Sequence, residues 1–193
     1  MESIERMSEE DRILIRESWK VITKNIKDTS FLIFDMIFSQ SPDCKLMFPF
    51  MKISENGKKR STEMDFHSLR FMQVLESMVN SIDHPLSICP LLDNLGRLHG
   101  RLAISKGFKA HHWSVFIECT LFHFRKVLSQ NRRFISLITL DKTMIVWRTL
   151  LRSIIKCMKV GLNRDLSNRT IVHEDNQSSS LSTLPSIPMY YYI

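Results

Sequence analysis

The sequence predicts an all-helical domain, and three observations support this fold class. Glycine and proline are scarce, at 5 and 6 of 193 residues, whereas folds built from many short strands need frequent turn residues. Hydrophobic residues make up 44% of the chain and charged residues 24%, which is typical of a globular protein with one core. Apolar residues also recur at helical spacing over long segments. We therefore expect about seven to eight helices and a single domain.

The first helix is predicted to begin at Ser8. Ser8 followed by Asp11 is an acidic variant of the capping box, in which the side chain at the helix start accepts a backbone N–H. Residues at helical spacing then continue the pattern: Leu14, Ile15, Ser18, Trp19 and Ile22. Residues 1–7 are expected to form a flexible leader.

Turn residues separate the remaining helices. Pro42 suits the first position of a short helical turn, and the polar residues 52–62 are expected to form a loop. Pro85 and Pro90 bracket a second connection, and Ser105-Lys106-Gly107 forms a third. The longer helices are expected to cover about 28–40, 62–81, 91–104, 112–129 and 139–160.

Apolar periodicity is lost after residue 162. The following segment contains Ser178-Ser179-Ser180 and two prolines, Pro185 and Pro188, a composition typical of disorder. We therefore expect a leader over 1–7, a helical domain over 8–162 and a disordered tail over 163–193.

Charge and hydropathy exclude several classes of protein. The net charge is +7, but basic residues are dispersed apart from Lys58-Lys59-Arg60 and Arg132-Arg133, so no nucleic-acid partner is expected. No apolar run approaches the ~20 residues that span a bilayer, and residues 1–6 lack the apolar core of a signal peptide. We expect a cytoplasmic protein whose four cysteines are reduced.

One histidine lies on the apolar face of the helix expected over 62–81. At the angular step of an α-helix, His67 shares an arc of about 80° with Met64, Phe71, Leu75 and Met78. Such a histidine, taken alone, more often lies in or beside a core than binds a ligand.

The helix expected over 91–104 repeats this arrangement. His99 lies beside a face formed by Leu91, Leu95, Leu98 and Leu102. An imidazole buried there without a partner would be costly. A bond from one ring nitrogen to a metal would provide a partner, and the other nitrogen could donate to a backbone carbonyl.

Two histidines on separate apolar helix faces fit a flat apolar cofactor between them. Haem takes one or two axial imidazoles and otherwise needs apolar walls. A zinc site would need more nitrogen, sulfur or carboxylate ligands than these faces offer. The sequence also lacks a paired-carboxylate motif, a phosphate-binding loop and a nucleophile elbow.

Residues 8–160 resemble the globin family. Trp19 matches the tryptophan of the family's first helix. Pro42 and Phe48 match the proline that opens its short third helix and the phenylalanine that wedges against haem.

His67 matches the distal histidine of this family and His99 the proximal one. The stretch Leu95-Gly96-Arg97-Leu98-His99 resembles neuroglobin-type and invertebrate, including nematode-type, single-domain globins.

The resemblance implies a globin fold around a pocket for haem b, iron protoporphyrin IX. His99 would hold the iron, and His67 would contact the gas or act as a sixth ligand. Without bound gas, the iron could be five-coordinate, with His99 alone, or six-coordinate, with both histidines. The implied haem-contacting residues are Phe34, Phe38, Met47, Phe48, Met51, Arg70, Phe71, Leu75, Leu95, Leu98 and Leu102.

The roles of the other side chains near this site are less specific. Arg70 fits a contact with a haem propionate and a solvated position equally well. Trp113 and Phe116 are the inward candidates of the next helix. The remaining histidines are expected to lack a buried partner: His84, His111, His112, His123 and His173.

Reversible binding of oxygen or another diatomic gas, for transport or storage, is the leading function. The alternative is a bis-histidyl redox or gas-signalling globin with nitric oxide dioxygenase or nitrite reductase side activity. A helical interaction module that has lost haem is the third hypothesis. A second copy of the chain and a reductase are the candidate protein partners.

Overall fold

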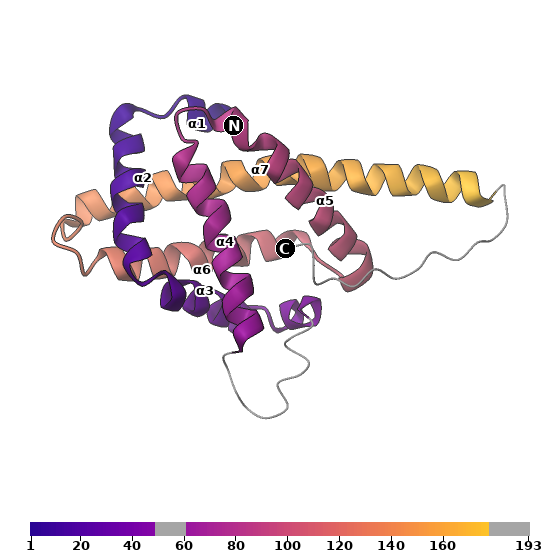
Figure 1. The fold of residues 1–193 in the computed structure, drawn as a ribbon, viewed down its shortest axis with the longest axis horizontal. Helices are drawn as coiled ribbons and strands as arrows, with labels where there is room; N and C mark the ends of the chain where they lie inside the picture. Colours follow the sequence, from indigo (N-terminus) through magenta and orange to yellow (C-terminus); the bar gives the residue numbers. More distant parts are fainter. Residues whose placement is uncertain (49–60, 178–193) are drawn as a thin grey trace.

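The computed structural model describes residues 1–48 and 61–177, which form helices and contain no strand (Figure 1). The predicted all-helical fold class is confirmed. The α-helices are α1 Glu2–Glu5, α2 Glu9–Ile22, α3 Ile26–Gln40, α4 Thr62–Asn80, α5 Cys89–Lys106, α6 Ala110–Leu128 and α7 Leu137–Gln177. Short 3-10 helices lie at η1 Thr23–Asn25, η2 Pro42–Met47 and η4 Pro85–Ile88. None of the described helices combines the length and apolarity needed to cross a membrane.

Local sequence signals begin and end the helices much as predicted. The Ser8 Oγ accepts the Asp11 N–H at 3.2 Å and caps α2. Gly107 ends α5 with a φ of 72°, in the left-handed region that glycine adopts without steric cost. Pro90 lies within the first turn of α5 rather than before the helix, because a first-turn residue needs no N–H for the helical ladder.

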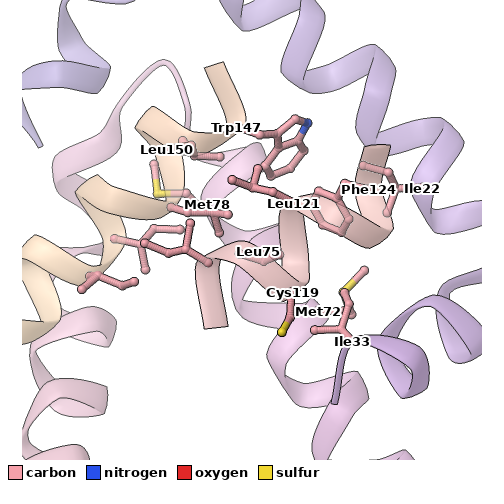
Figure 2. Packing of buried hydrophobic residues seen from close by; sticks show 14 of the residues in the cluster. Ile22, Ile33, Met72, Leu75, Met78, Cys119, Leu121, Phe124, Trp147 and Leu150 are labelled. Atoms are coloured by element: carbon pink, nitrogen blue, oxygen red, sulfur yellow. The ribbon is translucent and has the colours of Figure 1, made fainter. Parts of the chain in front are cut away.

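The core is centred on Trp147 of α7, which is fully buried. Its ring lies 5.9 Å from that of Trp19 and 4.9 Å from that of Phe124. Its Nε1–H donates to the Ser18 Oγ at 2.8 Å, so the buried indole keeps a hydrogen-bond partner. Figure 2 shows Trp147 among apolar side chains that include Leu121 and Phe124. Burial of this apolar surface is the main stabilising contribution to the fold.

Helix α7 packs against α1, α2, α5 and α6, while α3 packs against α4 and α6. In Figure 1, α7 passes behind the middle of the molecule and its C-terminal end extends beyond α5. Helices from the beginning, middle and end of the chain therefore share one core.

Helices α5 and α7 approach each other backbone to backbone. A Cβ atom on Gly96 would lie 1.9 Å from the Met158 carbonyl oxygen. A Cβ atom on Gly161 would lie 2.1 Å from the Asp93 carbonyl oxygen. Only glycine at these two positions permits the observed distance between the helices.

This contact buries a different face of α5 from the one that leucine periodicity suggested. The buried residues of α5 are Leu92, Gly96 and Gly100, whereas Leu91 is 40% exposed. The side chains of the predicted leucine face beyond Leu91, and the His99 side chain, are partly exposed. Helix α5 is therefore fixed to α7 by one face, and its leucine face remains accessible.

The N-terminal residues are not a flexible leader, contrary to the sequence prediction. They form α1, which contacts α7, and Ile4 is fully buried. The guanidinium of Arg12 donates to the carbonyl oxygens of Ile4 and Glu5, each at 3.2 Å. Met1 and Met7 also pack against the core, so three apolar side chains and the hydrogen bonds of Arg12 dock a segment too short to show periodicity.

At the other end, α7 continues to Gln177 instead of ending near residue 160. Leu162 packs against the core, and Asp165 forms an ion pair with Arg169 one turn later at 2.7 Å. Leu162 and Asp165 lie against Gly96 and Gly100 of α5, so inward residues one turn apart hold this part of α7 without a full apolar period. Residues 178–193 lie outside the described residues, and the limits of the domain stay a prediction.

Candidate functional site

His99 is held by a hydrogen bond within its own helix. Its Nδ1 lies 2.8 Å from the Leu95 carbonyl oxygen. Because a carbonyl only accepts, Nδ1 carries the proton and donates, which leaves the lone pair on Nε2. This is the tautomer that a histidine needs to bind a metal through Nε2.

Two aromatic rings enclose His99 and fix its plane. The Trp113 indole is stacked on the imidazole at 4.9 Å and 29°, and the Phe108 ring meets it edge-on at 5.1 Å. Trp113 is buried, as the sequence suggested. Phe108 was missed, although its place directly after the helix-ending Gly107 was the available signal.

His67 lies on α4 among aromatic rings from other parts of the chain. Its imidazole meets the Phe34 ring at 5.2 Å and the Phe48 ring at 4.7 Å, both nearly perpendicular. Phe34 of α3 also lies 5.9 Å from Phe71, which in turn lies 4.6 Å from Phe116 of α6. The surroundings of His67 are therefore mainly aromatic.

Burial keeps both histidines neutral at pH 7. Burial is the largest of the causes that together lower the pKa of His67 to about 4, and the nearby positive charges of His99 and Arg70 are the others. Burial also lowers the pKa of His99, although the hydrogen bond to the Leu95 carbonyl acts in the opposite direction. A ligating imidazole nitrogen must be deprotonated. Two neutral imidazoles flanked by apolar rings fit the donor set and walls that haem requires.

The structure places the residues predicted to contact haem in three groups. Phe34, Phe38, Met47 and Leu75 are buried, and Leu75 belongs to the core drawn in Figure 2. The partly exposed group comprises Phe48, Phe71, Leu95, Leu98 and Leu102. Met51 lies outside the described residues. Arg70 is exposed, and its guanidinium carbon lies 5.6 Å from the centre of the Phe66 ring. Their roles in binding haem stay predictions.

His112 and His123 are buried, and His112 also has a partner, contrary to the sequence prediction. His123 is 7% exposed. The His112 side chain is 3% exposed, and its Nε2 lies 3.0 Å from the Asp43 Oδ2. Hydrogen bonds from Ser41 and His112 hold the pKa of Asp43 well below its usual range. Sequence reasoning missed this pair because its members are far apart in the chain.

Acid is expected to destabilise the haem-free protein. The pKa of His67 is about 4 in the folded chain but about 6.5 when unfolded. Between these values the unfolded chain binds more protons, so the free energy of unfolding falls as the pH falls through this window. Urea unfolding from pH 7.5 to 4.5 measures this slope. Below about pH 7, the free energy of unfolding should depend less steeply on pH in His67→Leu than in the unsubstituted protein, and above that pH the two proteins should have the same slope. Equal slopes at every pH would contradict the prediction.

Comparison with known proteins identifies the family. The Globin family model matches residues 32–136, more than half of the chain. Globin-related protein glb-13 of Caenorhabditis elegans is 26% identical over 160 residues, which are 82% of this chain and 54% of that protein. Neuroglobin of Dissostichus mawsoni is 27% identical over 104 residues, 53% of this chain and 65% of its own length. The chain spans about half to two thirds of the length of these curated relatives.

A solved structure shares the fold. A hexacoordinated haem protein from an anhydrobiotic tardigrade superposes with a TM-score of 0.67 at 16% identity, over 82% of this chain and 96% of that one. The family match includes α4 with His67 and α5 with His99. By this match, the chain belongs to the globin family.

Proposed function

We propose that this globin binds haem and, at the haem iron, reversibly binds a diatomic gas such as oxygen. The observation that carries the proposal is the tautomer of His99, whose Nε2 lone pair is available because Nδ1 donates to the Leu95 carbonyl. Membership of the globin family supports the same assignment.

The residues of the site have separate roles in this proposal. His99 would hold the iron from the α5 side, with its ring plane kept by Trp113 and Phe108. The partly exposed leucines of α5 would contact the porphyrin: Leu95, Leu98 and Leu102. When bound, the haem supplies a ferrous iron that takes up the gas.

The opposite side of the site would control access to the iron. Phe34 and Phe48 lie against His67 and would exclude water from its surroundings. His67 offers a neutral imidazole there, because burial lowers its pKa. It is therefore able to approach the iron or the gas without first losing a proton.

The direct test is the visible spectrum of the reduced, haem-loaded protein with oxygen and with carbon monoxide. We expect the Soret band to shift with each gas and to return when the gas is removed. Absence of a shift with both gases would contradict gas binding. The lifetime of the oxygen complex then separates two roles: hours support carriage or storage, whereas seconds support a redox role.

We expect His67 to be the sixth ligand of the iron when no gas is present. The rings of Phe34 and Phe48 lie against His67 and offer no ligand atom themselves, so among these three side chains only the imidazole can bind the iron. The ferrous protein should show the sharp, split visible bands of low-spin haem. In His67→Leu these bands should collapse into one broad high-spin band, and gas should bind faster because no ligand has to leave first.

Glu63→Gln is the control, since it changes an exposed side chain one turn away on the same helix. It should retain the split bands. A single broad band in the unsubstituted protein would show that the iron is five-coordinate and would contradict ligation by His67.

A further inference from the structure

A buried histidine outside the His67–His99 site joins two distant parts of the chain. The Nε2 of His112, in the first turn of α6, lies 3.0 Å from the Oδ2 of Asp43 in η2. The other carboxylate oxygen, Oδ1, accepts the Ser41 hydroxyl at 2.5 Å. Asp43 is 46% exposed, whereas His112 is almost fully buried. We call the contact between Asp43 and His112 the η2–α6 tie.

The hydrogen bonds of His112 define its tautomer. The Lys109 backbone N–H donates to Nδ1 at 2.8 Å, so the lone pair lies on Nδ1. The proton of the neutral ring then lies on Nε2, which donates to Asp43. Both ring nitrogens are occupied, and the imidazole is held in one orientation.

The same tautomer disfavours a metal ion at this position. Ligand atoms of Asp43, His111 and His112 lie within 4.8 Å of one another, which is compatible with a shared cation. A metal on the His112 Nε2 would need the lone pair there and a proton on Nδ1. That proton would face the Lys109 N–H, so the α6 cap would be lost. The observed hydrogen bonds therefore favour a tie over a metal site.

At the α6 end, the tie adjoins the rings that enclose His99. The Phe108 ring lies 5.2 Å from His112 and 5.1 Å from His99. Phe108 also lies 4.8 Å from Trp113, the ring stacked on His99. A shift of His112 would therefore change the packing of both aromatic neighbours of His99.

At the η2 end, the tie adjoins the surroundings of His67. Helix η2 ends at Met47, and the next residue, Phe48, meets the His67 imidazole at 4.7 Å. Helix η2 also packs against α3 and α5. One hydrogen bond thus joins a segment that shapes the His67 side to the helix that shapes the His99 side.

We propose that Asp43 and His112 are positioning residues that retain haem, because the η2–α6 tie keeps Phe108 and Trp113 against His99 and Phe48 against His67. The inference rests on the proposed function, since it concerns a haem held by His99. Loss of the tie would loosen both sides of the site and let haem leave faster.

The test compares variants that break the tie from either end. In His112→Asn the side chain is shorter. Its amide oxygen still accepts the Lys109 N–H and preserves the α6 cap, but the side chain no longer reaches Asp43. Asp43→Ala breaks the tie from η2 and leaves the His112 cap intact. Haem transfer to an excess of apomyoglobin, followed at the Soret band, should be ~3- to 10-fold faster in each variant, the size expected for a change transmitted through packed side chains.

Three further variants separate the tie from general destabilisation. The double variant should lose haem no faster than either single one, because the tie can be lost only once. Asp43→Asn keeps an acceptor oxygen and should restore slow transfer. His111→Asn changes the neighbouring histidine, whose side chain is 52% exposed and whose Nε2 lies 3.6 Å from the Asp43 Oδ2. This variant should transfer haem at a rate near that of the unsubstituted protein.

Nitrogen NMR of the haem-free protein provides a readout that does not need haem, and it should show His112 with its proton on Nε2. Three results would overturn the proposal. The NMR spectrum could show the His112 proton on Nδ1, or the rate increases of the two single variants could multiply in the double variant. The unsubstituted chain could also bind one equivalent of zinc that His112→Asn does not bind. Unchanged transfer in both single variants would refute it while leaving gas binding standing. Failure of the proposed function is distinct, because the unsubstituted protein would then take up no haem.

Discussion

His99→Ala is expected to abolish stable haem retention. The hydrogen bond from Nδ1 of His99 to the Leu95 carbonyl leaves the lone pair on Nε2, the atom that would bind the iron. Without it, haem would be held by apolar contacts and by His67 alone, which lies on a different helix, α4. The ratio of haem to protein after gel filtration should fall far below one, and the spectrum should lose its defined Soret band.

Two comparisons make the result specific to the iron bond. His67→Leu should keep its haem, because His99 still anchors the iron, and this asymmetry distinguishes the two histidines. His99→Gly supplied with free imidazole should regain haem and spectrum, since the small molecule can take the place of the missing ring. Haem bound to His99→Ala at the original ratio with unchanged spectra would contradict the assignment of His99 as the proximal ligand.

Gly96→Ala is expected to destabilise the protein by about 3 kcal/mol or more. The new Cβ would lie 1.9 Å from the Met158 carbonyl oxygen, so two backbones must separate. The gain in helix propensity, about 1 kcal/mol for alanine over glycine, would be outweighed. Urea unfolding of the haem-free protein measures the effect. Because Gly96 precedes His99 by less than one turn, haem affinity should fall as well.

Gly100→Ala is the matched control on the same helix, one turn later. Its Cβ would lie 3.0 Å from the Asp165 Oδ2 and 3.2 Å from the Leu162 carbonyl oxygen. The Asp165 Cβ, at 3.1 Å, and the Leu162 carbonyl also have to give by a few tenths of an ångström. This is far less than the separation that Gly96→Ala forces, so the loss of stability should be clearly smaller, about 1 kcal/mol. Equal losses of stability in the two variants would show that the α5–α7 backbone contact does not limit residue size at Gly96.

The sequence alone determined the helical fold and the order of its helices. The caps at Ser8 and Gly107 depend on atoms a few residues apart, so local sequence contains the information needed to place them. Local sequence also places His67 and His99 on helices, because the helical spacing of apolar residues around each histidine defines the apolar face of its helix. Recognition of the globin family from these residues is confirmed by the family match.

The tertiary structure decided which face of α5 is buried. Leucine periodicity indicated one face, but the contact with α7 uses Gly96 and Gly100 on another. Glycine has no side chain and adds nothing to an apolar pattern. Its importance follows from how closely another backbone approaches, and that distance is a property of two helices rather than of one.

Long-range partners explain the other differences between the sequence prediction and the structure. Ile4 is buried because α7 passes beside it, and the buried His112 donates a hydrogen bond to Asp43, a residue 69 positions away in the chain. Neither segment is apolar enough to predict burial from its own composition. A single buried group is stabilised by whichever element the fold brings next to it, so only the folded chain reveals these partners.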